Sequence, residues 1–185
     1  MKRYRKQDFP VEDVRRFLEP GPVVLVASQW RGERDIMTMG WHMVLEFSPS
    51  LLACCISRGD HSHDLVRASG ECTINLPTVD IVDTVVGIGN CSGTEGDKFA
   101  RFGLTAEPAA VVAAPLIAEC HSGFECRLHD DSLVDRYDLF VWEVVRAHVA
   151  PRPAIPRTVH YRGDGRFMVS GPDISRRRLF RPEML

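Results

Sequence analysis

Four residues whose side chains or backbone can serve a ligand stand in an otherwise apolar run. The run, Asp35 to Ser57, reads DIMTMGWHMVLEFSPSLLACCIS and is expected to form two strands joined by a short turn. Within it lie Asp35, Thr38, Gly40 and His42. Strand interiors usually avoid glycine unless another group must approach the backbone closely. The pattern therefore indicates a ligand held against this backbone.

The same run can supply both surfaces that a flat cofactor needs. Met37, Met39 and Trp41 alternate along it and could form an apolar wall. Asp35 and Thr38 could hydrogen-bond to a polar ring edge or to a hydroxylated chain. An isoalloxazine ring has one such apolar face and one such polar edge. Composition alone makes this kind of site plausible and does not identify the ligand.

A second segment, SRGDHS, could receive an anionic group. Ser57, Arg58, His61 and Ser62 stand at the expected start of a helix, where free backbone N–H groups and the helix dipole favour a phosphate. In the simpler interpretation Asp60 is only the N-cap of that helix.

Other chemistries receive less support from spacing. His61 and His63, or Cys120 and Cys126, could ligate zinc or iron, but no third ligand follows at a usual interval, so we predict no metal site. Cys91 lies in a polar loop without the surroundings of a known nucleophile, and an unreactive thiol is the simpler interpretation. P-loop and GxGxxG patterns are absent from the sequence.

The elements that position these residues read as strands with helices inserted between them. We expect an N-terminal helix within residues 1–20, with a start at Asp8 and Pro10, and then a strand buried on both faces over Val23–Gln29. The opening run supplies two strands separated by Ser48–Ser50. Further elements are expected as a helix ended by Gly70, a half-buried strand over 71–77, a helix over 78–89, a short helix ended by Gly103 and a linker over 107–115.

The second half of the chain indicates a barrel. Residues 137–149, YDLFVWEVVRAHV, form one long predicted strand, and strands of this length usually bend around a barrel. A hairpin then turns at Gly163–Gly165. The fold class is therefore mainly β with inserted helices, an antiparallel barrel of Greek-key type that is closed or nearly closed.

Bulk composition limits the setting. The chain of 185 residues is expected to be one domain, 1–185, and its net charge of −2 gives no field that would recruit nucleic acid. A basic tail, 172–185, is interpreted as solvated or partner-clamping. Apolar runs are too short to span a membrane, and six cysteines without CxxC pairs indicate reduced thiols, so we expect a cytoplasmic protein.

An ordered series of motifs resembles one family. DIMTMGWHM…FSPSLLACCIS, HSHDLVRASGECTINLP, GDKFARFGLT, YDLFVWEVVRAHV and HYRGDGRFMVSG follow in the order of the flavin reductase-like family. The resemblance runs from about Pro20 to Gly171. Members of this family, which includes flavoredoxins, bind FMN in a split β-barrel, so the resemblance implies that fold and a non-covalent FMN.

The resemblance also implies a site and an assembly. Residues 35–42 would hold the ring and ribityl chain largely through backbone groups, and residues 55–58 and 61–62 the ribityl end and phosphate. The full set of cofactor-binding residues carried over comprises Asp35, Met37, Thr38, Met39, Gly40, Trp41, His42, Cys55, Ile56, Ser57, Arg58, His61, Ser62, Asn75 and Lys98. A homodimer with FMN near its interface is implied as well.

Two departures from the family pattern bear on activity. Asp35 replaces a usual Asn, so this side chain would accept hydrogen bonds rather than donate them. Asp135-Arg136-Tyr137 replaces the Gly-Asp-His that many NAD(P)H-dependent members carry, and Trp142 stands where those members often have Gly. His42 and Tyr137 are the candidates for the substrate side of the site.

Three functions remain open from the sequence. The first is an NAD(P)H-dependent flavin reductase that supplies reduced flavin to a monooxygenase. The second is a flavoredoxin-like electron-transfer protein that a redox partner reduces in place of a nicotinamide. The third is a structural or ligand-binding dimer without flavin, in which Met37, Met39 and Trp41 are only core.

Overall fold

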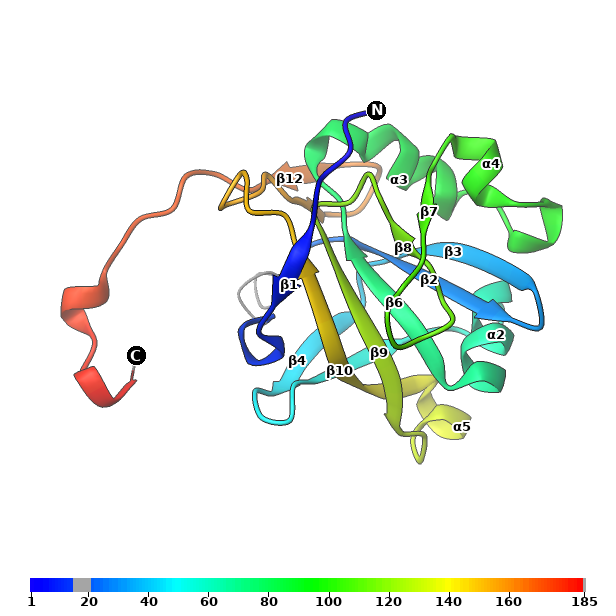
Figure 1. Ribbon diagram of the computed structural model, residues 1–185, viewed down its shortest axis with the longest axis horizontal. Helices are drawn as coiled ribbons and strands as arrows, with labels where there is room; N and C mark the ends of the chain where they lie inside the picture. The colour runs from blue at the N-terminus through cyan, green and yellow to red at the C-terminus, as the bar shows by residue number, and fades with distance from the viewer. Residues whose placement is uncertain (15–20, 185) are drawn as a thin grey trace.

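An eight-stranded antiparallel sheet organises the chain (Figure 1). The computed structural model describes residues 1–14 and 21–184. The strand order β3-β2-β6-β9-β10-β5-β4, with β1 beside β10, brings together segments far apart in sequence, as the predicted Greek-key-type barrel requires. The strands of this sheet are β1 (Gln7–Phe9), β2 (Val24–Trp30), β3 (Glu33–Met39), β4 (His42–Glu46), β5 (Leu51–Cys55), β6 (Glu71–Leu76), β9 (Ser122–Asp130) and β10 (Leu139–Val149).

The opening run forms three strands, where we predicted two. β3 ends at Met39, and Gly40 and Trp41 separate it from β4. β3 and β4 are the two outer strands of the sheet order, so the sheet does not close into a ring. Trp41 bends back onto β5, where its carbonyl accepts a hydrogen bond from the Cys55 N–H at 2.9 Å. The barrel is split at the segment that carries the candidate residues.

Two hydrophobic cores lie on opposite faces of β2. Val24 and Val26 point into the barrel interior with Phe124 and Trp142, and Leu25 packs into a second core beneath the helices. Such a strand, buried on both sides, reads as a continuous apolar run, and the prediction for Val23–Gln29 is confirmed within one residue.

Helices cover the side of the sheet that carries β2 and β3 (Figure 1). α2 (His61–Ser69) ends at Gly70 and α4 (Lys98–Phe102) at Gly103, and both glycines adopt the left-handed conformation that glycine tolerates best. Between them the chain forms the 3₁₀ turn η2 (Val79–Ile81), α3 (Val82–Gly89) and the 3₁₀ turn η3 (Gly93–Glu95). The predicted helices in this part of the chain are confirmed.

The strand predicted to be half-buried is buried on both faces. In β6, Thr73 and Asn75 are as inaccessible as Cys72 and Ile74. The Asn75 amide donates to the Thr73 hydroxyl at 2.9 Å and accepts from the Ile117 N–H at 3.1 Å. Alternation of polar and apolar residues indicated a solvent face, but a loop covers that face and its polar groups are paired.

The long predicted strand is β10, which begins after the short helix α5 (Val134–Tyr137). Phe140, Trp142 and Val144 point into the barrel, and an irregularity in the pairing with β9 between Val144 and Arg146 turns Ala147 inward. Trp142 is fully buried and stacks on Phe140 with ring centroids 5.6 Å apart. This residue therefore fills the interior of the barrel.

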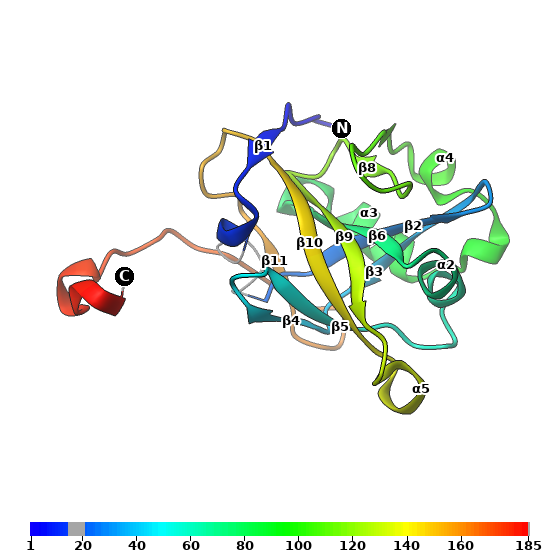
Figure 2. The same cartoon turned by 60° about the horizontal axis from the view of Figure 1, so that its bottom comes forward.

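The chain termini differ from expectation at one end. The predicted helix start at Asp8 and Pro10 is wrong, because Gln7–Phe9 form a strand that pairs with β10. Val11–Asp13 then form a 3₁₀ turn, η1. The rest of the predicted helix, residues 15–20, lies outside the described residues. At the other end a hairpin of β11 (Val159–Tyr161) and β12 (Phe167–Val169) confirms the predicted turn. The tail beyond it, with the turns η4 (Arg177–Leu179) and η5 (Pro182–Met184), extends away from the sheet in both views (Figure 2). Two short strands, β7 (Ala106–Glu107) and β8 (Leu116–Ile117), flank the predicted linker.

Candidate functional site

A cavity of about 460 Å³ lies between β3, the start of α2 and the loop that joins α3 to α4. We call it the polar cavity. Its lining includes six of the predicted cofactor-binding residues: Asp35, Met37, Thr38, His61, Ser62 and Lys98. Most of the rest of its wall comes from the loop, over residues 88–95. Asp35 and Lys98, the first and last of these six residues in the chain, are more than 60 positions apart, so only the fold brings the set together.

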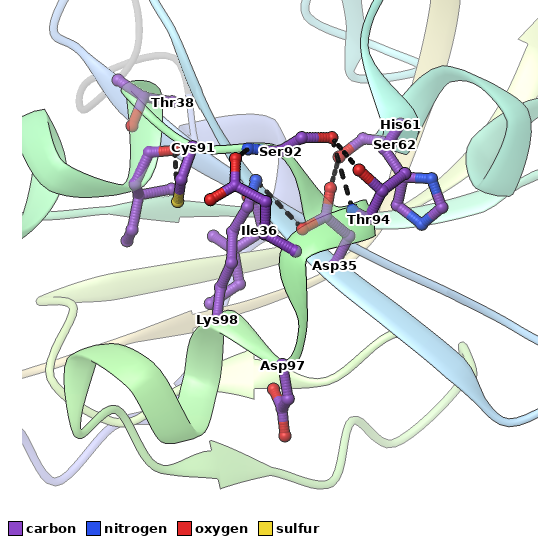
Figure 3. A network of polar contacts seen from close by, with 12 residues as sticks. Asp35, Ile36, Thr38, His61, Ser62, Cys91, Ser92, Thr94, Asp97 and Lys98 are labelled. Carbon is purple, nitrogen blue, oxygen red and sulfur yellow. Dashed lines mark hydrogen bonds and ion pairs between the residues drawn. The ribbon is translucent and has the colours of Figure 1, made fainter.

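A buried ion pair forms one wall of the polar cavity (Figure 3). Lys98 Nζ lies 3.1 Å from Asp35 Oδ1 and donates to the Ile36 carbonyl at 2.7 Å. Ser62 Oγ donates to Asp35 Oδ2 at 2.7 Å. Asp35 Oδ1 meets Lys98 as an ion pair without the alignment of a hydrogen bond, and the side chains of Asp35 and Lys98 are 2% and 4% exposed. The carboxylate and the ammonium therefore neutralise each other inside the site.

A second cavity, of about 600 Å³, adjoins the first. We call it the aromatic cavity, since Trp41, Tyr161 and Phe167 line it together with Val85 and Val86 of α3. Trp41 is 78% exposed and Tyr161 is 58% exposed. Gly40 also lines this cavity, and a Cβ at that position would meet nothing within 4 Å. The backbone here is open to a ligand, as the sequence indicated.

The two cavities share Thr38, Gly89 and Asn90 and so form one groove. Thr38 stands at the junction, where its hydroxyl donates to the Val85 carbonyl at 2.6 Å. β3 is an edge strand with β2 as its pairing partner in the sheet. An edge strand offers backbone N–H and C=O groups to an extended or flat ligand. The groove thus combines an aromatic end, a backbone edge and a polar end.

Seven of the predicted cofactor-binding residues do not line either cavity. Met39 and Ile56 belong to the barrel core. Consequently Met37, Met39 and Trp41 form no common wall: Met39 is buried in the core, Met37 packs against that core and also lines the polar cavity, and Trp41 lines the aromatic cavity. Asn75 lies in the interior with its amide paired, as described above. The remaining residues outside the groove are His42, Cys55, Ser57 and Arg58.

Arg58 holds α5. Its guanidinium donates to Asp138 Oδ1 at 2.9 Å and to the carbonyls of Val134 and Asp135. The Arg58 hydrogen bond keeps the pKa of the Asp138 carboxyl below its ordinary value. This cation, predicted to face a phosphate, is thus engaged by Asp138 and the carbonyls of α5 and does not line the polar cavity.

The two catalytic candidates also lie outside the groove. His42 Nε2 lies 2.7 Å from the Pro22 carbonyl, and burial lowers the pKa of His42, although that carbonyl acts in the opposite direction. Tyr137 ends α5 and is 54% exposed. Neither residue is among those that line the polar cavity or the aromatic cavity.

The cysteines and histidines behave as structural residues in most positions. Burial raises the pKa of the Cys54 and Cys72 thiols, so neither is a thiolate at neutral pH. Cys91 lines the polar cavity with its Sγ 3.7 Å from the Ile88 carbonyl. His61 Nε2 lies 2.9 Å from Glu33, whereas His63 is buried against Phe140. Across residues 1–14 and 21–184 no group of three or more His, Cys, Asp or Glu side chains is arranged to hold a metal ion.

Sequence reasoning missed the wall of the aromatic cavity formed by α3 and the hairpin. Val85 and Val86 read as ordinary helix residues, and Tyr161 and Phe167 as ordinary hairpin residues. One signal was available, since Tyr161 and Phe167 flank the Gly-Asp-Gly turn of a small hairpin, and an isolated hairpin must pack against another element to be stable. Because Tyr161 and Phe167 are far from Trp41 in the sequence, the sequence did not show that the three aromatic residues line one cavity.

The family follows from comparison with known proteins. The model of the flavin reductase like domain matches residues 15–167. This chain belongs to the flavin reductase-like family. The uncharacterized protein YddH of Escherichia coli (strain K12) is 30% identical over 174 residues, which cover 86% of this chain and 92% of YddH.

Solved structures share the fold of this family member. An FMN-binding domain of a flavin reductases-like enzyme from Shewanella baltica OS155 superposes with a TM-score of 0.86 at 24% identity, covering 95% of this chain and 99% of the other. Flavoredoxin of Desulfovibrio vulgaris (Miyazaki F) gives 0.77 at 23% identity, covering 85% and 90%. The predicted fold class, a split barrel of the flavin reductase-like type, is confirmed, and of the two forms left open, closed or nearly closed, the sheet takes the open one.

The groove fits two of the three parts of FMN, the ring and the hydroxylated chain, better than it fits the third, the phosphate. A planar ring matches the aromatic cavity, and a hydroxylated chain matches the polar groups of β3 and α2. A phosphate would meet the N-terminus of α2, which favours anions. Among the described residues that line the polar cavity, however, the one Lys or Arg is Lys98, and Asp35 neutralises it.

Proposed function

We propose that this family member is an FMN-binding oxidoreductase that takes electrons from NAD(P)H and passes them on as reduced flavin. The observation that carries the proposal is the continuous groove, in which an aromatic end and a polar end meet at Thr38 and Gly89 along an edge strand. Membership of the flavin reductase-like family supports the same conclusion.

The chain's own residues would bind and orient the cofactor. The bound flavin would supply the capacity to accept a hydride and to release electrons. Trp41 and Tyr161 would cover ring faces in the aromatic cavity. Ser62 and the first N–H groups of α2 would meet the chain of the flavin. Thr38 would fix the ring position relative to α3, because its hydroxyl is anchored on the Val85 carbonyl.

Access for a donor favours a reductase. Two side chains that line the aromatic cavity, Trp41 and Tyr161, stay largely exposed, and a nicotinamide ring could stack there on a second planar ring. Hydride transfer needs no side-chain acid or base, so the position of His42 and Tyr137 outside the groove does not oppose it.

Anaerobic stopped-flow mixing tests this proposal. The purified protein is loaded with FMN and mixed with NADH and, separately, with NADPH, while the visible absorption of the flavin is followed. Rapid bleaching by either nucleotide is the expected result. Absence of bleaching by both nucleotides, in protein shown to hold FMN, rejects the reductase.

An electron-transfer protein is the second candidate. Asp135-Arg136-Tyr137 stands where many NAD(P)H-dependent members carry Gly-Asp-His, and Tyr137 projects into solvent away from the groove. If this departure removes the nicotinamide contact, a redox protein would reduce the flavin. Reduction by a ferredoxin-type donor, with none by nicotinamides, would favour this second function.

We also propose a homodimer built on β4. Alternate residues at the free edge of the sheet, Trp41, Met43, Leu45 and Phe47, are 78%, 57%, 45% and 46% exposed. Monomeric proteins rarely expose a continuous row of large apolar side chains on an edge strand. A second copy would cover the row and bring its own surface beside the aromatic cavity, where Trp41 also lies.

The setting of the protein follows from the same proposal. A flavin reductase would deliver reduced flavin to a partner such as a monooxygenase. Within the described part of the chain, none of the helices is long and apolar enough to cross a membrane. All six cysteines are free, which supports a cytoplasmic location, where thiols stay reduced.

A further inference from the structure

The charge in the polar cavity is opposite to what a phosphate needs. Carboxylates of Asp35, Asp60 and Glu95 line it, against the single ammonium of Lys98. Glu95 is balanced by Arg101, 3.0 Å away, and Lys98 by Asp35. The described lining therefore holds paired charges and one additional carboxylate, Asp60, but no uncompensated cation.

Neighbouring side chains hold the Asp35 carboxylate beside the Lys98 ammonium, whose charge it neutralises. Its carboxylate accepts from Ser62 and contacts Lys98, and both oxygens stay within the wall of the cavity. A phosphate placed near Lys98 would lie close to this carboxylate as well, so attraction to one is largely cancelled by repulsion from the other. The N–H groups of α2 remain as donors and favour an anion over a hydroxyl, but the preference that an exposed helix end gives is below about tenfold.

The other candidate cation does not change this balance. Arg58 is turned onto Asp138 and the carbonyls of α5 and lines neither cavity. His61 faces Glu33. Arg58 and His61 thus each meet an acceptor of the protein, and Arg58 lines neither cavity.

We propose that Asp35 makes the site indifferent to the flavin phosphate, so that riboflavin and FMN bind with similar affinity and exchange as substrates. This inference rests on the proposed function and specifies its substrate class. Ring and ribityl contacts carry the binding, and the terminal group contributes little.

Equilibrium titration of the flavin-free protein with FMN and with riboflavin, followed by quenching of flavin fluorescence, tests it. For the wild-type protein the two dissociation constants should agree within about tenfold, since opposing unit charges cancel most of the phosphate contribution. Asp35→Asn removes the negative charge and leaves Lys98 uncompensated. It should tighten FMN by roughly tenfold to a hundredfold and change riboflavin by less than about threefold.

Two further variants control for charge and position. Asp35→Asn combined with Lys98→Met returns the pair to neutrality and should restore the wild-type ratio. Asp64→Asn removes the same charge from α2 at a side chain that is 86% exposed and lines neither cavity, and should leave both constants unchanged.

The outcomes separate the inference from the proposed function. If neither flavin binds, the proposed function fails. If both bind but the wild-type protein prefers FMN by more than about tenfold, or Asp35→Asn shifts the ratio no more than Asp64→Asn does, the inference is overturned and the proposed function stands. Should Asp35→Asn fail to fold, the ratio of the riboflavin and FMN dissociation constants of the wild-type protein still supports or overturns the inference.

Discussion

Replacing Trp41 tests whether the aromatic cavity holds the ring. Trp41 is 78% exposed, so the folded protein covers little of its surface, and Trp41→Ala should change the free energy of unfolding by less than about 0.5 kcal/mol. A ligand ring lying on one indole face would cover roughly 80 Å². At about 25 cal/mol per Å² that contact contributes ~2 kcal/mol to binding. The flavin dissociation constant should then rise roughly 30-fold.

The assay is fluorescence quenching of riboflavin by the purified variant, with thermal unfolding measured in parallel. Trp30→Ala is the matched control, because Trp30 is 40% exposed at the far end of β2 and lines neither cavity. Since Trp41 also belongs to the exposed row on β4, the oligomeric state is measured by light scattering. Tyr161→Ala, from the opposite wall, repeats the test away from that row.

A clear result would refute the reasoning. If Trp41→Ala and Tyr161→Ala both bind flavin as tightly as Trp30→Ala does, the aromatic cavity is not the ring site. A large fall in stability on Trp41→Ala would contradict the structure itself, since an exposed side chain cannot support the core.

Three further outcomes are expected. Leu45→Glu in the row on β4 should turn a dimer into a monomer in light scattering, whereas Val111→Glu, equally exposed elsewhere, should not. Gly123→Ala should cost about 1–3 kcal/mol in urea unfolding, because the new Cβ would lie 2.6 Å from Leu116 Cδ2, a buried side chain. Glu125→Gln should lower the free energy of unfolding at pH 7 by roughly 3 kcal/mol, because three backbone N–H groups and His148 lose hydrogen bonds to a charged carboxylate. Equal stability of the wild-type protein and the variant would contradict this prediction. Burial acts to raise the Glu125 pKa, but backbone N–H groups and His148 outweigh burial and lower that pKa. The Glu125 contribution to stability is therefore present above the unfolded pKa of about 4.3 and is lost as pH falls below that value. The free energy of unfolding of Glu125→Gln should consequently fall less steeply in acid than that of the wild-type protein.

Local patterns predicted most of the elements because they report local preferences. Glycines after α2 and α4 marked helix ends, and the apolar run of β2 marked a strand covered on both faces. The half-buried assignment of β6 failed because the loop that covers Thr73 and Asn75 is distant in sequence. The predicted helix start at Asp8 and Pro10 failed for a related reason, since Gln7–Phe9 pair with β10 in place of beginning a helix; residues 15–20 lie outside the described residues.

The candidate site was predicted in part. Asp35, Ser62 and Lys98 were carried over from motifs, and the fold brings them into one network. Arg58 carried the same kind of expectation, but α5 engages it, and spacing cannot reveal which of several acceptors a long side chain meets. Met39 lies in the barrel core on the same face of β3 as Met37, which packs against that core while only partly buried; alternation predicted the shared face but not which of the two side chains stays accessible to the cavity.

By itself the sequence determined most of the strands and helices, and that one glycine-bearing segment carries groups suited to a flat ligand, because these properties depend on residues close in the chain. Tertiary structure alone decided that β3 and β4 stay apart as edges, that α3 and the last hairpin complete the aromatic wall, and that Asp35 neutralises Lys98. The physical reason is that open edges, shared cavities and charge balance arise from contacts between residues tens of positions apart. Such contacts leave no periodic trace in the sequence.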